Sequence, residues 1–392
     1  MANAALHNLY MVAEITGGVT PPTPTMARFR NTGVTLGLSR GKMMSKELKP
    51  NRVQSDTRLG VRTASGEISA EALYDTPFQS ALQAVLCGTW VAGAAAVVCG
   101  GSSLSVSSVD NSFNHSANGL PVLSAGDMVK VTGHVNAANN GVFQVVSRTV
   151  SKIIVTAGTP LVTEIAPVTA TVTPMDKLSS GTTRRSFSFM RHFADLEAGK
   201  AYHMYTGCEF NSVNINVKPE EIVTASFGLF ARDAFLSTTA PVGSTLQTAS
   251  SAKPMDAFAG DLVEGLFGGT MVNLGIAVEA SFTLNNGIAP RFVIGSNASI
   301  SPSIATSSLT GSIKLFFDDT TMMEKFLNET ETAFLLSVRD VAGSYYVFEF
   351  PRVLLLDATA PVGADGPLTL DVPFTMQENS TWATHIRVWK VA

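Results

Sequence analysis

The sequence is poor in the residues that metal and disulfide sites require. Its 392 residues include six histidines and three cysteines, and charged residues make up only 15%. An odd number of cysteines without close paired spacings argues against a disulfide framework or a cysteine zinc site. No histidine pair has the spacing of a helical metal site. We therefore expect no metal and reduced, partly buried thiols, as in a protein that folds in the cytoplasm. The cysteines are Cys87, Cys99 and Cys208.

The sequence also lacks a recognisable catalytic motif. The glycine-rich run 265–269 has no lysine after it, and no Gly-x-Ser-x-Gly elbow occurs. Asp318-Asp319 could bind a ligand but suits a helix N-terminus better. Arg184-Arg185 could contact phosphate but more simply flanks a strand, and Asn139-Asn140-Gly141 could line a sugar site but is typical of a tight turn. We predict no catalytic, cofactor-binding or metal residues, and no enzyme activity.

Long apolar segments are nearly absent. The N-terminus has no basic head followed by an apolar core, so we expect no signal peptide. The uncharged run 82–98 is at the short limit for a membrane span and contains Gly88 and Gly93. We expect it to divide into a helix end and an alanine-rich segment, and we expect no membrane partner.

Glycine, serine, threonine, alanine and valine dominate, which favours strands and turns over long helices. Charge is unevenly distributed along the chain. Between Arg28 and Arg62 there are nine basic and two acidic residues, which leaves 27 − 9 = 18 basic and 31 − 2 = 29 acidic residues elsewhere. Nucleic-acid binding is one interpretation of this basic arm. Because the arm is sparse in aromatics, we favour docking on the acidic body of a neighbouring copy.

The stretch from Ser45 to Leu86 contains the clearest local pattern. After a basic segment without a clean period, residues 40–56, apolar residues alternate with polar ones up to Ala72. Asp75 and Thr76 are N-cap candidates, and Pro77 suits a first helical turn. The apolar residues that follow share one helical face: Phe78, Leu82, Val85 and Leu86. The sequence predicts a loop, a strand and a short helix.

The chain repeats this order of elements. Gly275–Ser281 is similar to Gly33–Ser39 and Gly311–Ile313 to Gly66–Ile68, at offsets of 275 − 33 = 242 and 311 − 66 = 245 residues. A weaker helix pattern follows Asp318-Asp319. These matches indicate a duplicated unit.

Later matches have smaller offsets. Tyr345–Leu355 is similar to Tyr202–Val213 and Leu368–Met376 to Val223–Ala231, at 345 − 202 = 143 and 368 − 223 = 145 residues. The first copy therefore carries about 245 − 144 = 101 extra residues. Short β runs with turn residues between them lie inside that insertion, at 128–132, 141–146 and 153–156.

We predict a mainly β protein with two tandem barrel or sandwich units, each with a short helix, and a small inserted all-β domain. The predicted first domain is discontinuous, 1–100 and 176–245. The inserted domain is 101–175, and the second tandem domain is 246–392.

These segments resemble the major tail tube protein of long-tailed bacteriophages. The likeness covers nearly the whole chain through Glu47–Arg52, Gly66–Ile68, Phe78–Leu86, Val213–Phe230 and Pro351–Val353. The insertion is similar to accessory β modules that decorate such tubes, through Ala125–Asp127, Val131–Gly133 and Ala138–Gly141. The resemblance implies a structural virion protein whose rings stack around a lumen that conducts DNA to the host.

The resemblance also implies partners. Single-domain members form hexameric rings, so a chain with two tube domains implies a homotrimer with pseudo-sixfold symmetry, with a hexamer as the alternative. The basic arm would then dock on an adjacent ring. The tape measure protein and DNA would occupy the lumen transiently, with tail terminator and tail-tip proteins at the tube ends. The protein would be assembled in the host cytoplasm and reside in the virion tail.

Two other classes remain open from the residues alone. A carbohydrate-binding or adhesin-type β protein, as a fibre or capsid decoration, would need aromatics clustered on one β face, and only three tryptophans occur. A β-rich hydrolase would need an acid/base pair that the sequence does not suggest.

Overall fold

The computed structural model describes residues 3–50, 53–158, 161–167, 169–197, 199–258, 260–362 and 366–392. Within them, nearly all regular structure is β, which confirms the predicted fold class. The helices are α1 (Thr76–Val85) and α2 (Thr321–Leu327), with short 3₁₀ turns at Ala4–Leu6 and Ala137–Asn139.

Two sets of five antiparallel segments share one strand order. The first unit runs β3/β4 (Gly33–Val34, Gly37–Met44), β5 (Thr57–Glu71), β16 (Thr224–Ala231), β15 (Tyr202–Val217) and β14 (Phe187–Phe193). The second unit runs β21 (Ala277–Asn285), β24 (Ser308–Phe316), β27 (Thr369–Met376), β26 (Tyr345–Leu355) and β25 (Thr332–Arg339). In each unit the helix connects the same two strands, because α1 lies between β5 and β14 and α2 between β24 and β25.

The strand registers of the two units also match. Ile68 pairs with Phe227 in the first unit and Ile313 with Val372 in the second, so the offsets are 313 − 68 = 245 and 372 − 227 = 145. The irregularity between Phe187 and Phe189 recurs 145 residues later, between Thr332 and Phe334. The first unit therefore carries 245 − 145 = 100 more residues than the second, close to the predicted 101.

The predicted register of the first strand is wrong. Val34 lies opposite Ile68 and Ala280 opposite Ile313, which gives 280 − 34 = 246 residues rather than 242. The similar glycine and apolar spacings therefore identified equivalent strands but slipped by four positions. The pattern of a strand repeats every two residues, so it does not fix register by itself.

Further strands extend each unit. β1 (His7–Ala13), β2 (Thr25–Phe29), β17 (Asp233–Ser237) and β18 (Thr245–Leu246) flank the first, and β13 (Asp176–Ser179), β19 (Leu262–Glu264), β20 (Val272–Asn273) and β28 (Arg387–Val391) flank the second. The N-terminal residues belong to the sheet, since β1 pairs with both β2 and β14. The serine- and threonine-rich residues 237–253 contain β18.

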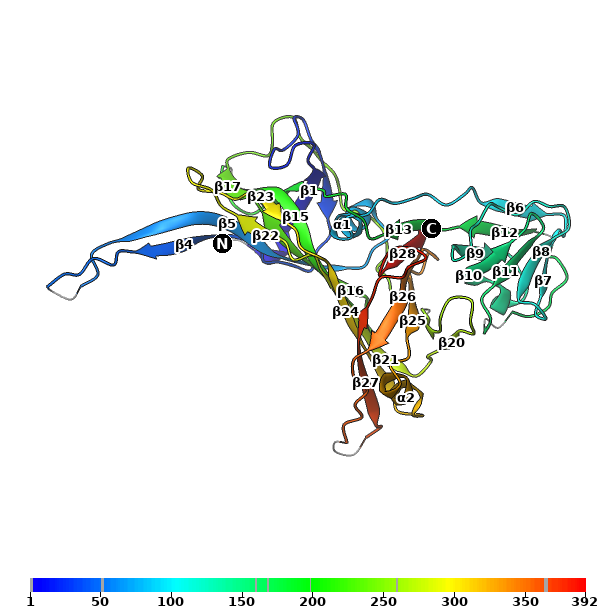
Figure 1. Cartoon of the computed structure of the whole chain (residues 1–392). Helices are drawn as coiled ribbons and strands as arrows, with labels where there is room; N and C mark the ends of the chain where they lie inside the picture. Colours follow the sequence, from blue (N-terminus) through cyan, green and yellow to red (C-terminus); the bar gives the residue numbers. More distant parts are fainter. Residues whose placement is uncertain are drawn as a thin grey trace.

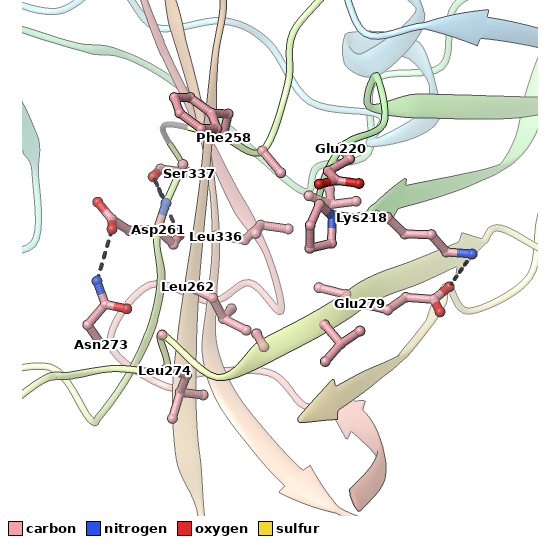
Figure 2. Close-up of a pocket in the computed structure, with 18 residues that line it drawn as sticks. Lys218, Glu220, Phe258, Asp261, Leu262, Asn273, Leu274, Glu279, Leu336 and Ser337 are labelled. Atoms are coloured by element: carbon pink, nitrogen blue, oxygen red, sulfur yellow. Dashed lines mark hydrogen bonds and ion pairs between the residues drawn. The ribbon is translucent and has the colours of Figure 1, made fainter. Parts of the chain in front are cut away.

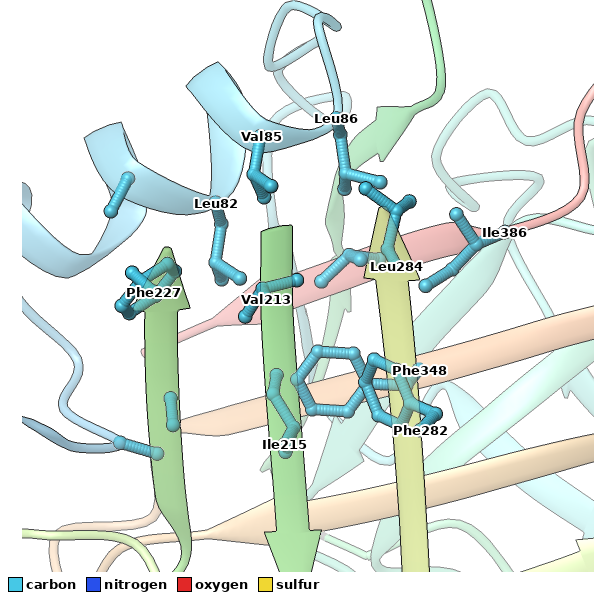
Figure 3. Packing of buried hydrophobic residues seen from close by; sticks show 14 of the residues in the cluster. Leu82, Val85, Leu86, Val213, Ile215, Phe227, Phe282, Leu284, Phe348 and Ile386 are labelled. Atoms are coloured by element: carbon cyan, nitrogen blue, oxygen red, sulfur yellow. The ribbon is translucent and has the colours of Figure 1, made fainter. Parts of the chain in front are cut away.

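One continuous core joins the two units. The C-terminal part of β15, Ser212–Val217, pairs with β21, so the sheet passes from the first unit into the second. Figure 3 shows β16, β15 and β21 side by side, with Leu82 and Val85 of α1 pointing onto them. Phe282 and Phe348 pack in the same core as a tilted pair with ring centroids 5.1 Å apart.

The predicted first helix is confirmed. The Asp75 side chain accepts a 2.9 Å hydrogen bond from the Phe78 amide, and the whole predicted apolar face is buried. At α2 the N-cap is Thr320 rather than the predicted aspartates, although the Asp319 side chain accepts a bond from the Thr321 amide at 2.8 Å.

A separate seven-stranded sheet follows α1 (Figure 1). Its strands β9, β10 and β11 match the predicted β runs, and it has its own apolar core. In spatial order the strands are β6 (Val97–Gly100), β12 (Thr169–Pro174), β9 (Met128–Thr132), β10 (Gly141–Arg148), β11 (Lys152–Val155), β8 (Ser112–His115) and β7 (Leu104–Ser107). The exact domain boundaries remain a prediction.

Candidate assembly interface

The hairpin of β4 and β5 projects from the body as a long arm, at the left of Figure 1. We define the first arm as residues 40–62. The prediction of a loop from Arg40 to Asp56 is wrong at its start, because β4 pairs with β5 as far as Met44 and Thr57. Asn51 and Arg52 of the quoted motif lie outside the described residues.

The first arm exposes apolar as well as basic side chains. Every residue of β4 is exposed, and Leu48 near the tip is 97% exposed. Arg40 donates to the Gly60 carbonyl at 3.0 Å, a bond within the hairpin itself. Because a lone two-stranded hairpin is marginally stable in water, such an arm is expected to gain a partner.

The equivalent hairpin of the second unit has a partner in the same chain. We define the second arm as residues 286–307, which include β22 (Ala289–Arg291) and β23 (Ile300–Ser303). The Asn286 side chain donates to the Val85 carbonyl at 2.7 Å, and Arg184 donates to the Pro302 carbonyl at 3.0 Å. The Arg62 amide donates to Asn297 at 2.8 Å.

A buried carboxylate orients the arginines beneath the second arm. Glu209 is 4% exposed and pairs with Arg184 at 2.6 Å and with Arg232 at 3.6 Å. Arg232 in turn reaches the Ser301 hydroxyl at 3.4 Å. The seat of the second arm is therefore a preorganised, positively charged surface on the first unit.

As with the two arms, one strand edge is covered within the chain and the equivalent edge of the other unit is not. Ser212–Val217 has β16 on one side and β21 on the other. The equivalent segment, 357–362 at the offset of 145, bridges β27 at Thr359 and Asp371 and has no strand on its other side in the described part of the chain. An uncovered strand edge is a template for another strand.

A cavity of about 520 Å³ lies at the junction of the two units (Figure 2). Leu262, Leu274 and Leu336 form apolar lining. Three carboxylates line it: Glu279 pairs with Lys218 at 3.2 Å, Asp261 accepts a bond from Asn273 at 2.9 Å, and Glu220 is exposed to solvent. The cavity offers no unpaired acid/base couple for catalysis.

The residues weighed as possible sites lie apart from one another. Arg184 supports the second arm, and the Asp319 side chain accepts a bond from the amide of the first residue of α2. In the inserted sheet, Asn139 is buried in a turn, where its side chain donates to Val162 and Glu164. All three cysteines are free and buried, and burial raises the pKa of the Cys208 thiol well above its usual value. No group of three or more metal-ligating side chains occurs among the described residues.

Sequence reasoning missed a buried charged cluster between the inserted sheet and the second unit. Glu349 and Arg387 form an ion pair and are 2% and 1% exposed. Gln144 of β10 and the indole of Trp389 each donate to Glu349 at 2.9 Å. Gln144, Glu349 and the β28 residues Arg387 and Trp389 come from three segments far apart in sequence, so only the fold brings them together.

His7 and His203 lie beside Arg191 at the edge of the first unit. This arrangement predicts that the stability of the fold depends on pH. His7 accepts from the Arg191 guanidinium at 3.1 Å. Burial, with the nearby charges of Arg191 and His203, lowers the pKa of His7 to about 4. The unfolded chain therefore binds more protons between pH 6.5 and 4, and stability present above pH 6.5 is lost as pH falls through that window.

We expect the thermal midpoint to fall between pH 7 and pH 4.5, and to fall less in His7→Gln, which keeps an acceptor for Arg191 but cannot titrate. Differential scanning fluorimetry at both pH values measures this difference. Since His7 is only partly buried, solvent screening keeps the effect modest. Equal pH slopes in the two proteins would contradict the assignment.

Comparison with known families decides what kind of protein carries these features. A family model described as phage tail tube protein matches residues 4–376. The chain belongs to the phage tail tube protein family. It is therefore a structural component of a phage tail, and the resemblance seen in the sequence is confirmed. A comparison with curated proteins found no match. No helix in the described residues is long and apolar enough to cross a membrane.

Proposed function

We propose that three copies of this tail tube protein close into a ring of six similar units, and that the rings stack into a tube whose lumen conducts DNA to the host. The observation that carries the proposal is the pairing of β15 with β21 inside one chain, while no strand of the described residues pairs with the outer edge of either equivalent segment, 34–39 or 357–362.

Register equivalence identifies the strands that would close the ring. In the second unit, β21 residues 280–285 are equivalent to residues 34–39 of the first unit, at the offset of 246. In the first unit, β15 residues 212–217 are equivalent to residues 357–362 of the second unit, at the offset of 145. Pairing 34–39 of one copy with 357–362 of the next would repeat the internal junction between chains. The Leu36 carbonyl accepts bonds from Tyr205 and Arg191 in the single chain, so those side chains must move on closure.

A tube of stacked rings implies further partners and a place of assembly. The tape measure protein and DNA occupy the lumen transiently, and the tail terminator and tail-tip proteins bind the tube ends. Assembly takes place in the host cytoplasm, and the tube becomes part of the virion tail. A lumen of acidic or weakly polar character would let DNA slide, because it releases no counterions by binding phosphate. We also propose that the chain has three domains. Residues 1–100 with 176–245 form the first tube domain, 101–175 form a decoration on the outside of the tube, and 246–392 form the second tube domain.

An adhesin function is less well supported. It would require aromatic side chains free on one β face, yet Trp389 is buried, Trp382 stacks on the Arg387 guanidinium at 3.6 Å, and Trp90 lies 4.4 Å from the Lys390 ammonium. All three tryptophans are thus engaged inside the chain.

Negative-stain electron microscopy with native mass spectrometry tests the ring. We expect rings with six lobes and masses at multiples of three chains. A protein that stays monomeric at all concentrations would overturn the proposal, and rings of six chains would replace the trimer by the hexamer.

A further inference from the structure

We propose that the first arm seats on the second unit of a neighbouring copy in the same ring, and that its positive charge fixes the order in which units alternate. The proposal rests on the ring of the proposed function and assigns the contact that orients it. The sequence alone suggested an adjacent ring as the partner. The structure provides a lateral example inside a single chain.

The example is the second arm on the first unit. Two arms at equivalent positions in equivalent units are expected to meet equivalent surfaces once a ring closes. Position 286, which is anchored at Val85, corresponds to Arg40 at the offset of 246. Position 302, which accepts from Arg184, corresponds to Thr57 at 245. The first arm meets its own chain at its base, where Arg62 pairs with Asp233 at 2.8 Å and its amide donates to Asn297, whereas every residue of β4 is exposed.

The two arms differ sharply in charge. The first arm carries seven basic and two acidic residues, a net charge of 7 − 2 = +5, whereas the second arm carries only Arg291, a net charge of +1. The surfaces that receive them should differ in the opposite sense.

The seats differ in that way. The offset of 145 places Glu329 where the first unit has Arg184, and Gln377 where it has Arg232. Around this position the second unit presents three carboxylates, Glu329, Glu331 and Glu378.

Arg352 contacts two of these three residues. Glu331 forms a two-pronged ion pair with Arg352, which also donates to the Glu378 carbonyl at 3.2 Å. The side chains of Glu329 and Glu378 are exposed and form no ion pair in the described part of the chain. They remain available to cations from another copy.

Charge then determines which surface each arm can occupy. A first arm placed on a first unit would meet Arg184, Arg185 and Arg232, and like charges at an interface select against that pairing. On a second unit it would meet the carboxylates instead. Exposed charges of this kind act on partner choice and association rate more than on folding.

Charge reversal on either side tests the contact. Glu329→Arg with Glu378→Arg should lower the fraction of chains in rings about tenfold at low salt, and Lys42→Glu with Arg58→Glu should do the same. None of these side chains forms an ion pair within the part of the chain that the structure describes, so thermal midpoints should stay unchanged. Combining all four changes in one chain should restore rings, because each reversed arm then meets a reversed seat.

The control is Glu197→Arg, a charge reversal in an exposed turn between β14 and β15 of the first unit, which should leave ring formation intact. Rings of normal abundance in the Glu329/Glu378 variant, or failure of the four-change chain to recover while it remains folded, would overturn the inference and leave the ring itself standing. Absence of rings in the unchanged protein would instead overturn the proposed function.

Discussion

Replacing Glu349 by leucine is expected to lower the free energy of unfolding by about 3–5 kcal/mol, the range measured when one partner of a buried ion pair is removed. The change leaves the Arg387 guanidinium, 1% exposed, without its carboxylate. It also removes the acceptor for the Gln144 amide and the Trp389 indole. Both donors would then be buried without partners.

The matched control removes the charge as well. Glu349→Leu with Arg387→Met should recover most of the lost stability, because a buried ion pair can be replaced by apolar residues of similar volume at little cost. Recovery should stop short of complete, since Arg387 also stacks on Trp382. Denaturant unfolding of the three proteins gives the values. Equal stability of the Glu349→Leu and wild-type proteins would contradict the importance of the pair.

The same cluster determines how the inserted sheet is attached. Gln144 comes from the inserted sheet, while Glu349 and Arg387 belong to β26 and β28. Lys130 of the inserted sheet also donates to the Gly343 carbonyl at 2.7 Å. Met128 of that sheet packs in one apolar cluster with Leu335 and Trp389. A deletion of the insertion would therefore uncover apolar and charged groups on the second unit, and these positions need polar replacements in any such design.

Elements defined by local chemistry were predictable from the sequence. The Asp75 cap, Pro77 and the spacing of Phe78, Leu82 and Val85 are all signals within one helix, and the structure confirms each of them. The duplicated order of elements was also visible, because equivalent strands keep similar lengths and turn residues after duplication.

What could not be predicted depends on partners distant in sequence. The segment from Arg40 to Met44 has no clean apolar period, since both its faces are exposed and nothing requires one face to be apolar. It is a strand because β5 supplies hydrogen bonds to it. The Glu349 cluster gave no signal for the same reason: its members lie on strands that only the completed sheet brings together. The seat of the second arm likewise combines residues from both sides of the insertion.

The edge of the second unit gives the other large expected effect: Ala360→Pro should abolish rings while leaving the chain folded. Thr359 exchanges both backbone hydrogen bonds with Asp371, at 3.1 and 2.9 Å, so it faces β27. In an antiparallel ladder the next residue faces the opposite edge, and the Ala360 amide therefore points outward, where the proposed neighbour would pair. Proline removes that donor and adds bulk at the edge, but breaks no bond to β27.

The effect should be large because a closed ring contains the contact several times. Leaving one backbone partner unsatisfied costs about 1–3 kcal/mol, and a ring of three chains has three such junctions, which makes about 3–9 kcal/mol in all. Ala360→Val, similar in size to proline but with its amide intact, should still form rings. Size-exclusion chromatography with light scattering distinguishes rings from single chains, and a thermal scan shows that the proline variant is folded. Rings formed equally well by both variants would exclude pairing at this edge.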